Sequence, residues 1–144
     1  MEMTIEKDYI NKLILSAMDS CEKAYSPYSK FKVGAAILTD DFKIYEGFNI
    51  ECAAYSICNC AERTALFRAV YDGHKHFKAI AVVGKRDIDD SFSEYCPPCG
   101  MCRQALREFC NPKTFKIILA KSVDDYKIYT LEDLLPESFG SDNL

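Results

Sequence analysis

The spacing of apolar side chains along the chain predicts four helices. Between residues 5 and 24 apolar positions recur every three to four residues, which places them on one face of a helix that Thr4 is suited to cap. The same rhythm predicts a helix over residues 60–71 that ends at Gly73, and another over residues 100–110 that stops at Asn111. A short fourth helix over residues 131–135 is closed by Pro136.

Short continuous runs of apolar residues predict the strands. Residues 33–39 form the first strand, Asp40 and Asp41 supply a turn, and residues 42–47 return as the second strand of a hairpin. The runs at 79–84 and 115–120 are typical of buried strands, the former covered on both faces, and 126–130 is a shorter candidate. Because helices alternate with these strands, the pattern predicts an α/β fold with layers around one sheet.

Length, composition and charge narrow the class of protein. The 144 residues fit one domain over residues 1–144, and 49% apolar with 28% charged residues is an ordinary globular balance. No apolar run approaches the roughly 18 residues that cross a bilayer, so we expect no membrane association. The net charge is −4 and the basic residues are scattered, which weighs against a nucleic-acid partner.

The cysteine content stands out. Residues 1–12 carry charge throughout and lack the apolar core of a signal peptide, so we expect a cytoplasmic protein whose thiols stay reduced. In such a compartment the eight cysteines indicate metal binding or catalysis rather than disulfides. Five of them fall in two short clusters, Cys58-Asn59-Cys60 and Cys96-Pro97-Pro98-Cys99-Gly100-Met101-Cys102.

The second cluster has the spacing of metal ligands. Cys99 and Cys102 lie three residues apart at a predicted helix start, so their sulfurs share one side of the first turn. The helix dipole there favours the thiolate, and a distant cysteine would complete a typical zinc site. A thioredoxin-like redox pair is the alternative, but it leaves Cys58 and Cys60 without a role.

The first cluster places a carboxylate beside the expected metal. Cys60 begins the second predicted helix, and Glu62 follows two residues later. Next to a zinc ion with an open position, Glu62 is a candidate general acid and base for a bound water. A closed and inert zinc site with Cys58 as fourth ligand is the alternative, in which Glu62 only interacts with the helix dipole.

At these residues the sequence resembles the zinc nucleoside and nucleobase deaminases. Cys60-Ala61-Glu62, followed by Pro98-Cys99-Gly100-Met101-Cys102, matches their C/H-x-E … P-C-x-x-C signature. The likeness is to the small homotetrameric cytidine deaminases and runs from about residue 8 to the C-terminus. Other matching segments are Tyr25-Ser26-Pro27-Tyr28-Ser29, residues 31–36, Gly47-Phe48-Asn49-Ile50-Glu51, Ala53-Ala54-Tyr55-Ser56, and Leu134-Leu135-Pro136.

The resemblance implies a fold and an activity. The fold would be a three-layer α/β/α sandwich with a central mixed five-stranded sheet, assembled as a homotetramer. The activity would be the hydrolytic deamination of cytidine and 2′-deoxycytidine in pyrimidine salvage, with one Zn²⁺ per chain held by Cys60, Cys99 and Cys102. Glu62 would take a proton from a water at the fourth zinc position, pass it to ring nitrogen N3, and later protonate the leaving ammonia.

The resemblance also implies substrate contacts. Asn49 and Glu51 would hydrogen-bond the ribose 3′-hydroxyl, and the backbone N–H of Ala61 would donate to the base O2. The aromatic residues implied in the site are Phe31, which would line the pocket, and Tyr55 and Phe139, which would reach a neighbouring subunit's site.

Arg63 has an implied role in the charge balance. Three thiolates on Zn²⁺ leave a net charge of −1, which reduces its power to acidify water, and Arg63 would offset that charge together with two helix N-termini. Cys52, where asparagine is common, and Cys96, an additional thiol near the ligands, depart from the family pattern.

Two other classes of function are open. One is a deaminase of another substrate, but deoxycytidylate and tRNA adenosine deaminases usually carry histidine where Cys60 stands, and blasticidin-type enzymes lack the pair that Asn49 and Glu51 resemble. The other is a structural zinc module that binds a protein partner, which would not convert cytidine to uridine.

Overall fold

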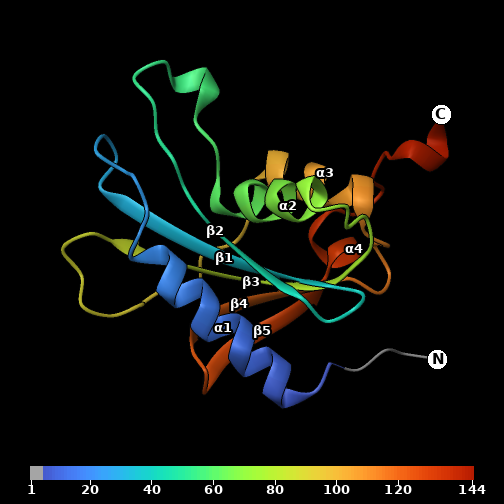
Figure 1. The fold of residues 1–144 in the computed structure, drawn as a ribbon, viewed down its shortest axis with the longest axis horizontal. Helices are drawn as coiled ribbons and strands as arrows, with labels where there is room; N and C mark the ends of the chain where they lie inside the picture. Colours follow the sequence, from blue (N-terminus) through green and yellow to red (C-terminus); the bar gives the residue numbers. More distant parts are fainter. Residues whose placement is uncertain (1–4) are drawn as a thin grey trace.

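The computed structural model describes residues 5–144, whose strands form one mixed sheet in the order β2-β1-β3-β4-β5 (Figure 1). Strands β3 and β4 run parallel, and the other neighbouring pairs are antiparallel. The strands are β1 (Phe31–Thr39), β2 (Ile44–Phe48), β3 (Phe77–Arg86), β4 (Lys116–Ser122) and β5 (Asp125–Thr130).

Helices cover both faces of the sheet. Figure 1 shows α1 (Lys7–Cys21) across one face and α2 (Ala61–Tyr71) with α3 (Gly100–Phe109) on the other. The short helix α4 (Leu131–Leu134) and the 3₁₀ turns η1 (Tyr55–Ile57) and η2 (Ser141–Asn143) complete the described elements. This arrangement confirms the expected three-layer α/β/α sandwich with five strands. Within residues 5–144, no helix has the length and apolar character needed to cross a membrane.

The core lies on both sides of the central strands. Ala35 and Ile37 of β1 pack in the layer with α2 and α3, whereas the alternating Ala36 and Leu38 pack against α1. The same alternation occurs along β3, which explains why its sequence is continuously apolar, as predicted for a strand covered on both faces.

Most element boundaries differ from the prediction by one to three residues, and the starts of β2 and α1 are the most informative differences. Strand β2 begins at Ile44 rather than residue 42, because Phe42 has a φ of 67° in the turn and cannot start an extended strand there. Helix α1 begins at Lys7 with Glu6 as its N-cap residue, and Glu6 makes no side-chain capping bond. The predicted cap Thr4 lies outside the described residues.

A close backbone contact aligns β2 with the start of α2. A Cβ atom at Gly47 would lie 2.4 Å from the carbonyl oxygen of Ala61 and 2.4 Å from the backbone nitrogen of Ala65. Only glycine permits this approach. It places the first turn of α2 beside the end of β2, where the loop that carries Asn49 and Glu51 begins.

Candidate metal centre and substrate pocket

Three cysteines from two helix starts meet at one point. Cys60 is the N-cap residue of α2, Cys99 is the N-cap residue of α3, and Cys102 lies in the first turn of α3. The Sγ atom of Cys99 lies 3.8 Å from that of Cys60 and 3.5 Å from that of Cys102, and all three sulfurs are within 4.8 Å of one another. The sequence-predicted ligands are therefore brought together.

The size of this sulfur triangle fits zinc. Tetrahedral coordination with Zn–S bonds of about 2.3 Å requires sulfurs about 3.8 Å apart. Cys58 does not join the triangle, because its Sγ accepts a hydrogen bond from the backbone N–H of Cys52 at 3.2 Å. Among the described residues, the group that can hold a metal ion thus contains three cysteines and not the four of a closed structural site.

The triangle is set in a positive environment. An Nη atom of Arg63 donates to the Sγ of Cys60 at 3.5 Å, which places a positive charge against this sulfur. A hydrogen bond from Cys102 and the bond from Arg63 lower the pKa of the Cys60 thiol to about 5. Both helix N-termini add partial positive charge at the same place. These effects favour thiolates, the form that ligates zinc.

Glu62 lies in the first turn of α2, directly after the Cys60–Ala61 step. Its side chain is buried, with an exposed fraction of 4%, and burial raises the pKa of its carboxyl to about 7. The nearby Cys60 charge acts in the same direction, and Cys102 is close enough to hydrogen-bond the carboxyl. A carboxyl in such a setting holds and releases a proton near neutral pH, as a general acid and base requires.

A cavity of about 580 Å³ opens beside Glu62 and the sulfurs. It is lined by Val33 of β1, the loop between β2 and α2, the start of α2, and the chain just before and at the start of α3. The predicted site residues in its wall are Asn49, Glu51, Tyr55, Cys60, Ala61, Glu62, Arg63 and Cys99. Its volume is in the range of small-molecule sites.

Asn49 and Glu51 have structural partners that the sequence did not reveal. The amide of Asn49 accepts a hydrogen bond from the Val33 N–H and donates one to the Phe31 carbonyl, both at 2.9 Å. Glu51 accepts bonds from the backbone N–H groups of Tyr28 and Ser29 at 3.0 Å and from the Ser29 hydroxyl. Both side chains are therefore fixed in place before any ligand binds.

The three aromatic residues predicted for the site are more exposed than Asn49 and Glu51, and two of them lie outside the cavity wall. Phe31 and Phe139 do not line this cavity, and their exposed fractions are 37% and 56%. Tyr55 lines one edge but is 75% exposed, at the tip of the projecting loop. The cavity wall also contains Ser56, Cys96, Pro97 and Met101, which the sequence analysis did not predict as binding residues. Three of these four residues belong to the second cysteine cluster, and that position was the available signal.

Comparison with known proteins places this geometry in a family. The model of the cytidine and deoxycytidylate deaminase zinc-binding region matches residues 7–118. The chain belongs to the cytidine and deoxycytidylate deaminase family. The family is zinc-binding, and the triangle of Cys60, Cys99 and Cys102 can hold the one metal ion that it requires.

Relatives within the deaminase family span nearly the whole chain. The cytidine deaminase of Sporosarcina psychrophila is 47% identical over 135 residues, which cover 94% of each protein. The cytidine deaminase of Halalkalibacterium halodurans is 43% identical over 92% of this chain and 95% of the relative.

A solved structure shows the same fold. The crystal structure of cytidine deaminase from Burkholderia pseudomallei has a TM-score of 0.79 and 45% identity, covering 89% of this chain and 97% of the other. The sequence resemblance to this family is therefore confirmed.

Proposed function

We propose that this chain catalyses the hydrolytic deamination of cytidine and 2′-deoxycytidine to uridine and 2′-deoxyuridine, with release of ammonia. The observation that carries the proposal is the buried Glu62 carboxyl beside three zinc-competent sulfurs at the wall of a nucleoside-sized cavity. A pyrimidine salvage role in the cytoplasm, by a single catalytic domain over residues 1–144, belongs to the same proposal.

Cys60, Cys99 and Cys102 hold the metal in this proposal. When bound there, zinc lowers the pKa of water towards neutrality and so supplies a hydroxide nucleophile. Arg63 and the N-termini of α2 and α3 reduce the excess negative charge of the three thiolates, and the bond from Arg63 to Cys60 supports this role.

Glu62 moves the protons. Its carboxylate takes a proton from the attacking water and delivers it to ring nitrogen N3 of cytosine. It then takes the remaining proton from the new hydroxyl on C4 and transfers it to the amino group, so that C4 becomes a carbonyl as ammonia leaves. The burial of Glu62 supports this role, because its raised pKa lets the carboxyl cycle between both protonation states near neutral pH.

Asn49 and Glu51 orient the ribose. After its bonds to Phe31 and Val33, the Asn49 amide retains one N–H, and one Glu51 oxygen retains a lone pair after the bond from Ser29. A ribose 3′-hydroxyl can accept from the first and donate to the second. The N–H of Ala61, which has no partner within α2, is available to the base O2.

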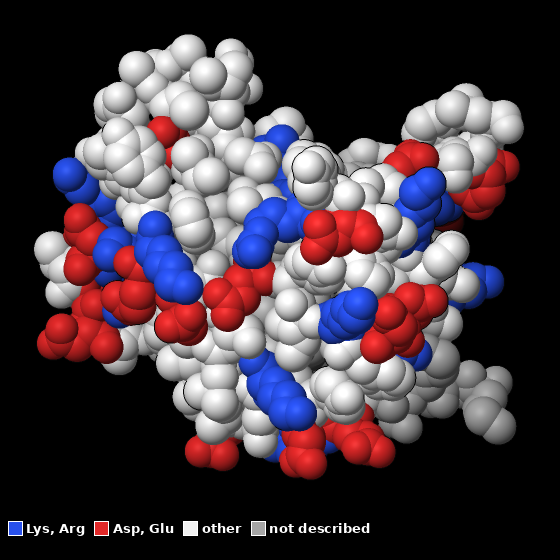
Figure 2. Space-filling model, in the orientation of Figure 1, with Lys and Arg blue, Asp and Glu red and all other residues white. Residues whose placement is uncertain are grey.

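The charges of the cavity favour a nucleoside over a nucleotide. Its charged wall residues are two acids, Glu51 and Glu62, and Arg63, which is already bound to Cys60. Figure 2 shows basic and acidic residues interspersed over the lower part of the face, while the projecting lobe at its upper left is almost free of charge. A phosphate-bearing substrate would need a free basic residue here.

We further propose a homotetramer in which subunits share active sites. Phe31 would contact the substrate from the edge of the pocket, while Tyr55 and Phe139 would reach the site of a neighbouring subunit. The large exposure of both residues supports this arrangement, since an exposed aromatic side chain is free to be buried against a second chain.

An absorbance assay tests the proposed function. Cytidine and deoxycytidine should lose ultraviolet absorbance as they are converted, whereas deoxycytidylate and adenosine should be poor substrates. Turnover of deoxycytidylate or adenosine in preference to cytidine would show another deaminase specificity. No turnover of any of them by the zinc-loaded protein would favour a binding module instead.

A further inference from the structure

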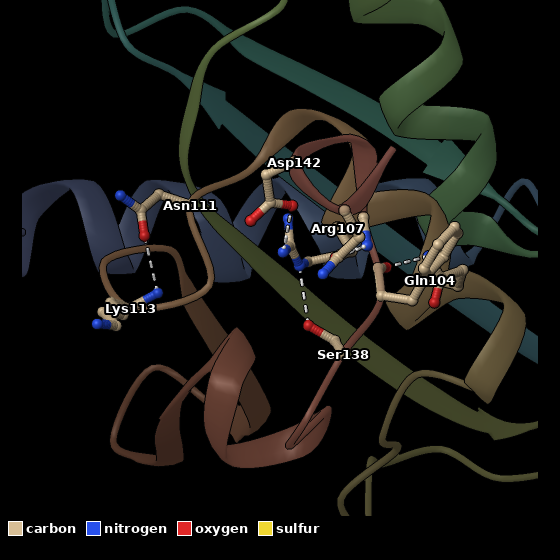
Figure 3. Close-up of polar contacts among 9 residues, drawn as sticks. Gln104, Arg107, Asn111, Lys113, Ser138 and Asp142 are labelled. Atoms are coloured by element: carbon tan, nitrogen blue, oxygen red, sulfur yellow. Dashed lines mark hydrogen bonds and ion pairs between the residues drawn. The ribbon is translucent and has the colours of Figure 1, made fainter.

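Side chains of α3 hold the C-terminal segment, residues 138–142, which we call the tail. The Nε atom of Arg107 donates to the hydroxyl of Ser138 and an Nη atom to the carboxylate of Asp142, both at 2.8 Å (Figure 3). One turn earlier on α3, the amide of Gln104 donates to the carbonyl oxygen of Phe139 at 2.8 Å. The tail is thus bonded before, at and after Phe139.

The fit between Arg107 and the tail is tight. The Arg107 side chain is only 11% exposed, so its bond to the half-buried Ser138 is shielded from water, whereas Asp142 is 70% exposed and its bond is more strongly screened. Gly140 is buried against the guanidinium, and a Cβ atom there would lie 2.5 Å from the nearer Nη atom of Arg107. A residue with any side chain at position 140 would displace the guanidinium from its partners.

Two further features fix the direction of the tail. Glu137 has a φ of 52°, a left-handed conformation uncommon for glutamate, at the point where the chain turns away from α4. Beyond Gly140, the side chain of Asn143 accepts a hydrogen bond from the Gly140 N–H at 2.8 Å. The backbone is therefore ordered, yet the Phe139 ring that it carries is 56% exposed.

We propose that Arg107 is a positioning residue that fixes the tail so that Phe139 is presented to the pocket of a neighbouring subunit. Gln104 assists by holding the Phe139 carbonyl. This inference rests on the proposed role of Phe139 in a shared active site. Arg107 touches no substrate itself, and its effect on catalysis passes through the aromatic ring.

The first experiment measures KM, kcat and zinc content of Arg107→Met. Loss of the ring from its position should raise KM for cytidine about ten- to a hundredfold, as expected for a lost base–aromatic stack, with kcat and zinc content unchanged. Lys113→Met is the matched control, because Lys113 lines the same surface pocket as Arg107 but makes none of the tail bonds, and its KM should stay at the wild-type value.

A second variant perturbs the same contact without removing charge. Gly140→Ala should displace the guanidinium and raise KM to a similar degree. If Arg107→Met folds poorly, this variant still tests the proposal, and an unchanged KM in a folded Gly140→Ala protein would overturn it.

The double variant Arg107→Met/Phe139→Ala separates this role from a general structural one. If Arg107 acts through the ring, the double variant has the same KM as Phe139→Ala alone, whereas an additive increase overturns the proposal. A raised KM in Phe139→Ala with a normal KM in Arg107→Met overturns the positioning role and leaves the shared site intact. A normal KM in Phe139→Ala removes the shared-site role and this inference with it, while deamination by the wild type stands.

A subunit-mixing experiment distinguishes loss of the tail contact from damage to the metal centre. The control is needed because α3 carries both Arg107 and the metal ligand Cys102. In mixed oligomers of Arg107→Met and Glu62→Gln chains, the intact Glu62 of the former is served by the intact tail of the latter. Sites with a normal KM should therefore appear. A KM that stays high despite proven mixing would show that Arg107 acts within its own subunit and would contradict the proposal.

Discussion

The metal centre and the aromatic residues predicted for the site differ in how deeply they are buried within the single chain. Cys60, Cys102 and Glu62 lie at the starts of two helices that pack on the sheet, and Cys102 and Glu62 are buried. Tyr55 and Phe139 belong to projecting segments and remain mostly exposed. The difference is consistent with the proposed function, in which the proton and metal chemistry belongs to the single chain and the aromatic contacts to the substrate come from a neighbouring subunit.

Removal of a metal ligand should have the largest effect. Serine at Cys60, Cys99 or Cys102 should abolish zinc retention and activity, because two sulfurs cannot complete the site. Metal content after dialysis and cytidine turnover measure this.

The remaining cysteines near the pocket provide the controls. Serine at Cys58 or Cys96 should leave the zinc content at one per chain, since Cys58 interacts with the backbone of Cys52 instead. Loss of zinc from Cys58→Ser would contradict the three-sulfur site.

Glu62→Gln should separate proton transfer from metal binding. Gln has the same shape but cannot shuttle protons, so kcat should fall by about 10²–10⁴-fold while fold and zinc content are retained. Stopped-flow or absorbance kinetics on the zinc-loaded variant measure the loss. Turnover close to that of the wild type would reduce Glu62 to a partner of the helix dipole.

Phe139→Ala tests whether an exposed aromatic residue of one subunit contributes to the active site of its neighbour. We expect substrate use to weaken about ten- to a hundredfold, because a base–aromatic stack is worth roughly 1–3 kcal/mol, and the zinc content should not change. Mixing these chains with inactive Glu62→Gln chains should restore activity. A fully active monomer, or no recovery after proven mixing, would rule out shared sites.

Asn49→Ala should have the smallest catalytic effect and a distinct stability effect. The variant loses two hydrogen bonds to β1, at Phe31 and Val33, so the free energy of unfolding should fall by about 1–3 kcal/mol. Loss of one bond to the ribose should raise KM by about two- to tenfold. Denaturant unfolding and steady-state kinetics measure the two effects.

A control for this variant lies outside the wall of the cavity. Asn111→Ala removes a side-chain bond to the Lys113 N–H, and because Asn111 does not line the cavity, the change should affect stability without a change in KM. A normal KM in Asn49→Ala would assign that residue to the fold alone.

Local rules predicted the elements of an α/β fold and the ligand spacing of Cys99 and Cys102, whereas the five-stranded sandwich and the choice of Cys60 over Cys58 came from the resemblance to a family. Apolar periodicity and apolar runs located the four α-helices and five strands of the described residues but neither 3₁₀ turn, and the position of Cys60, Cys99 and Cys102 at helix starts is a short-range property. The hydrogen bonds of Asn49 and Glu51 were not predictable, since their partners lie 16 to 23 residues away in the chain. Nor did any sequence pattern indicate that Arg107 holds Ser138 and Asp142, 31 and 35 residues further on.

The most direct test of the central claim is the coordination of the metal. X-ray absorption on the purified zinc-loaded protein should show one zinc per chain with three sulfurs at about 2.3 Å and one light-atom ligand, which leaves the position that deamination requires. Four sulfurs around zinc would identify a closed structural site and contradict the account.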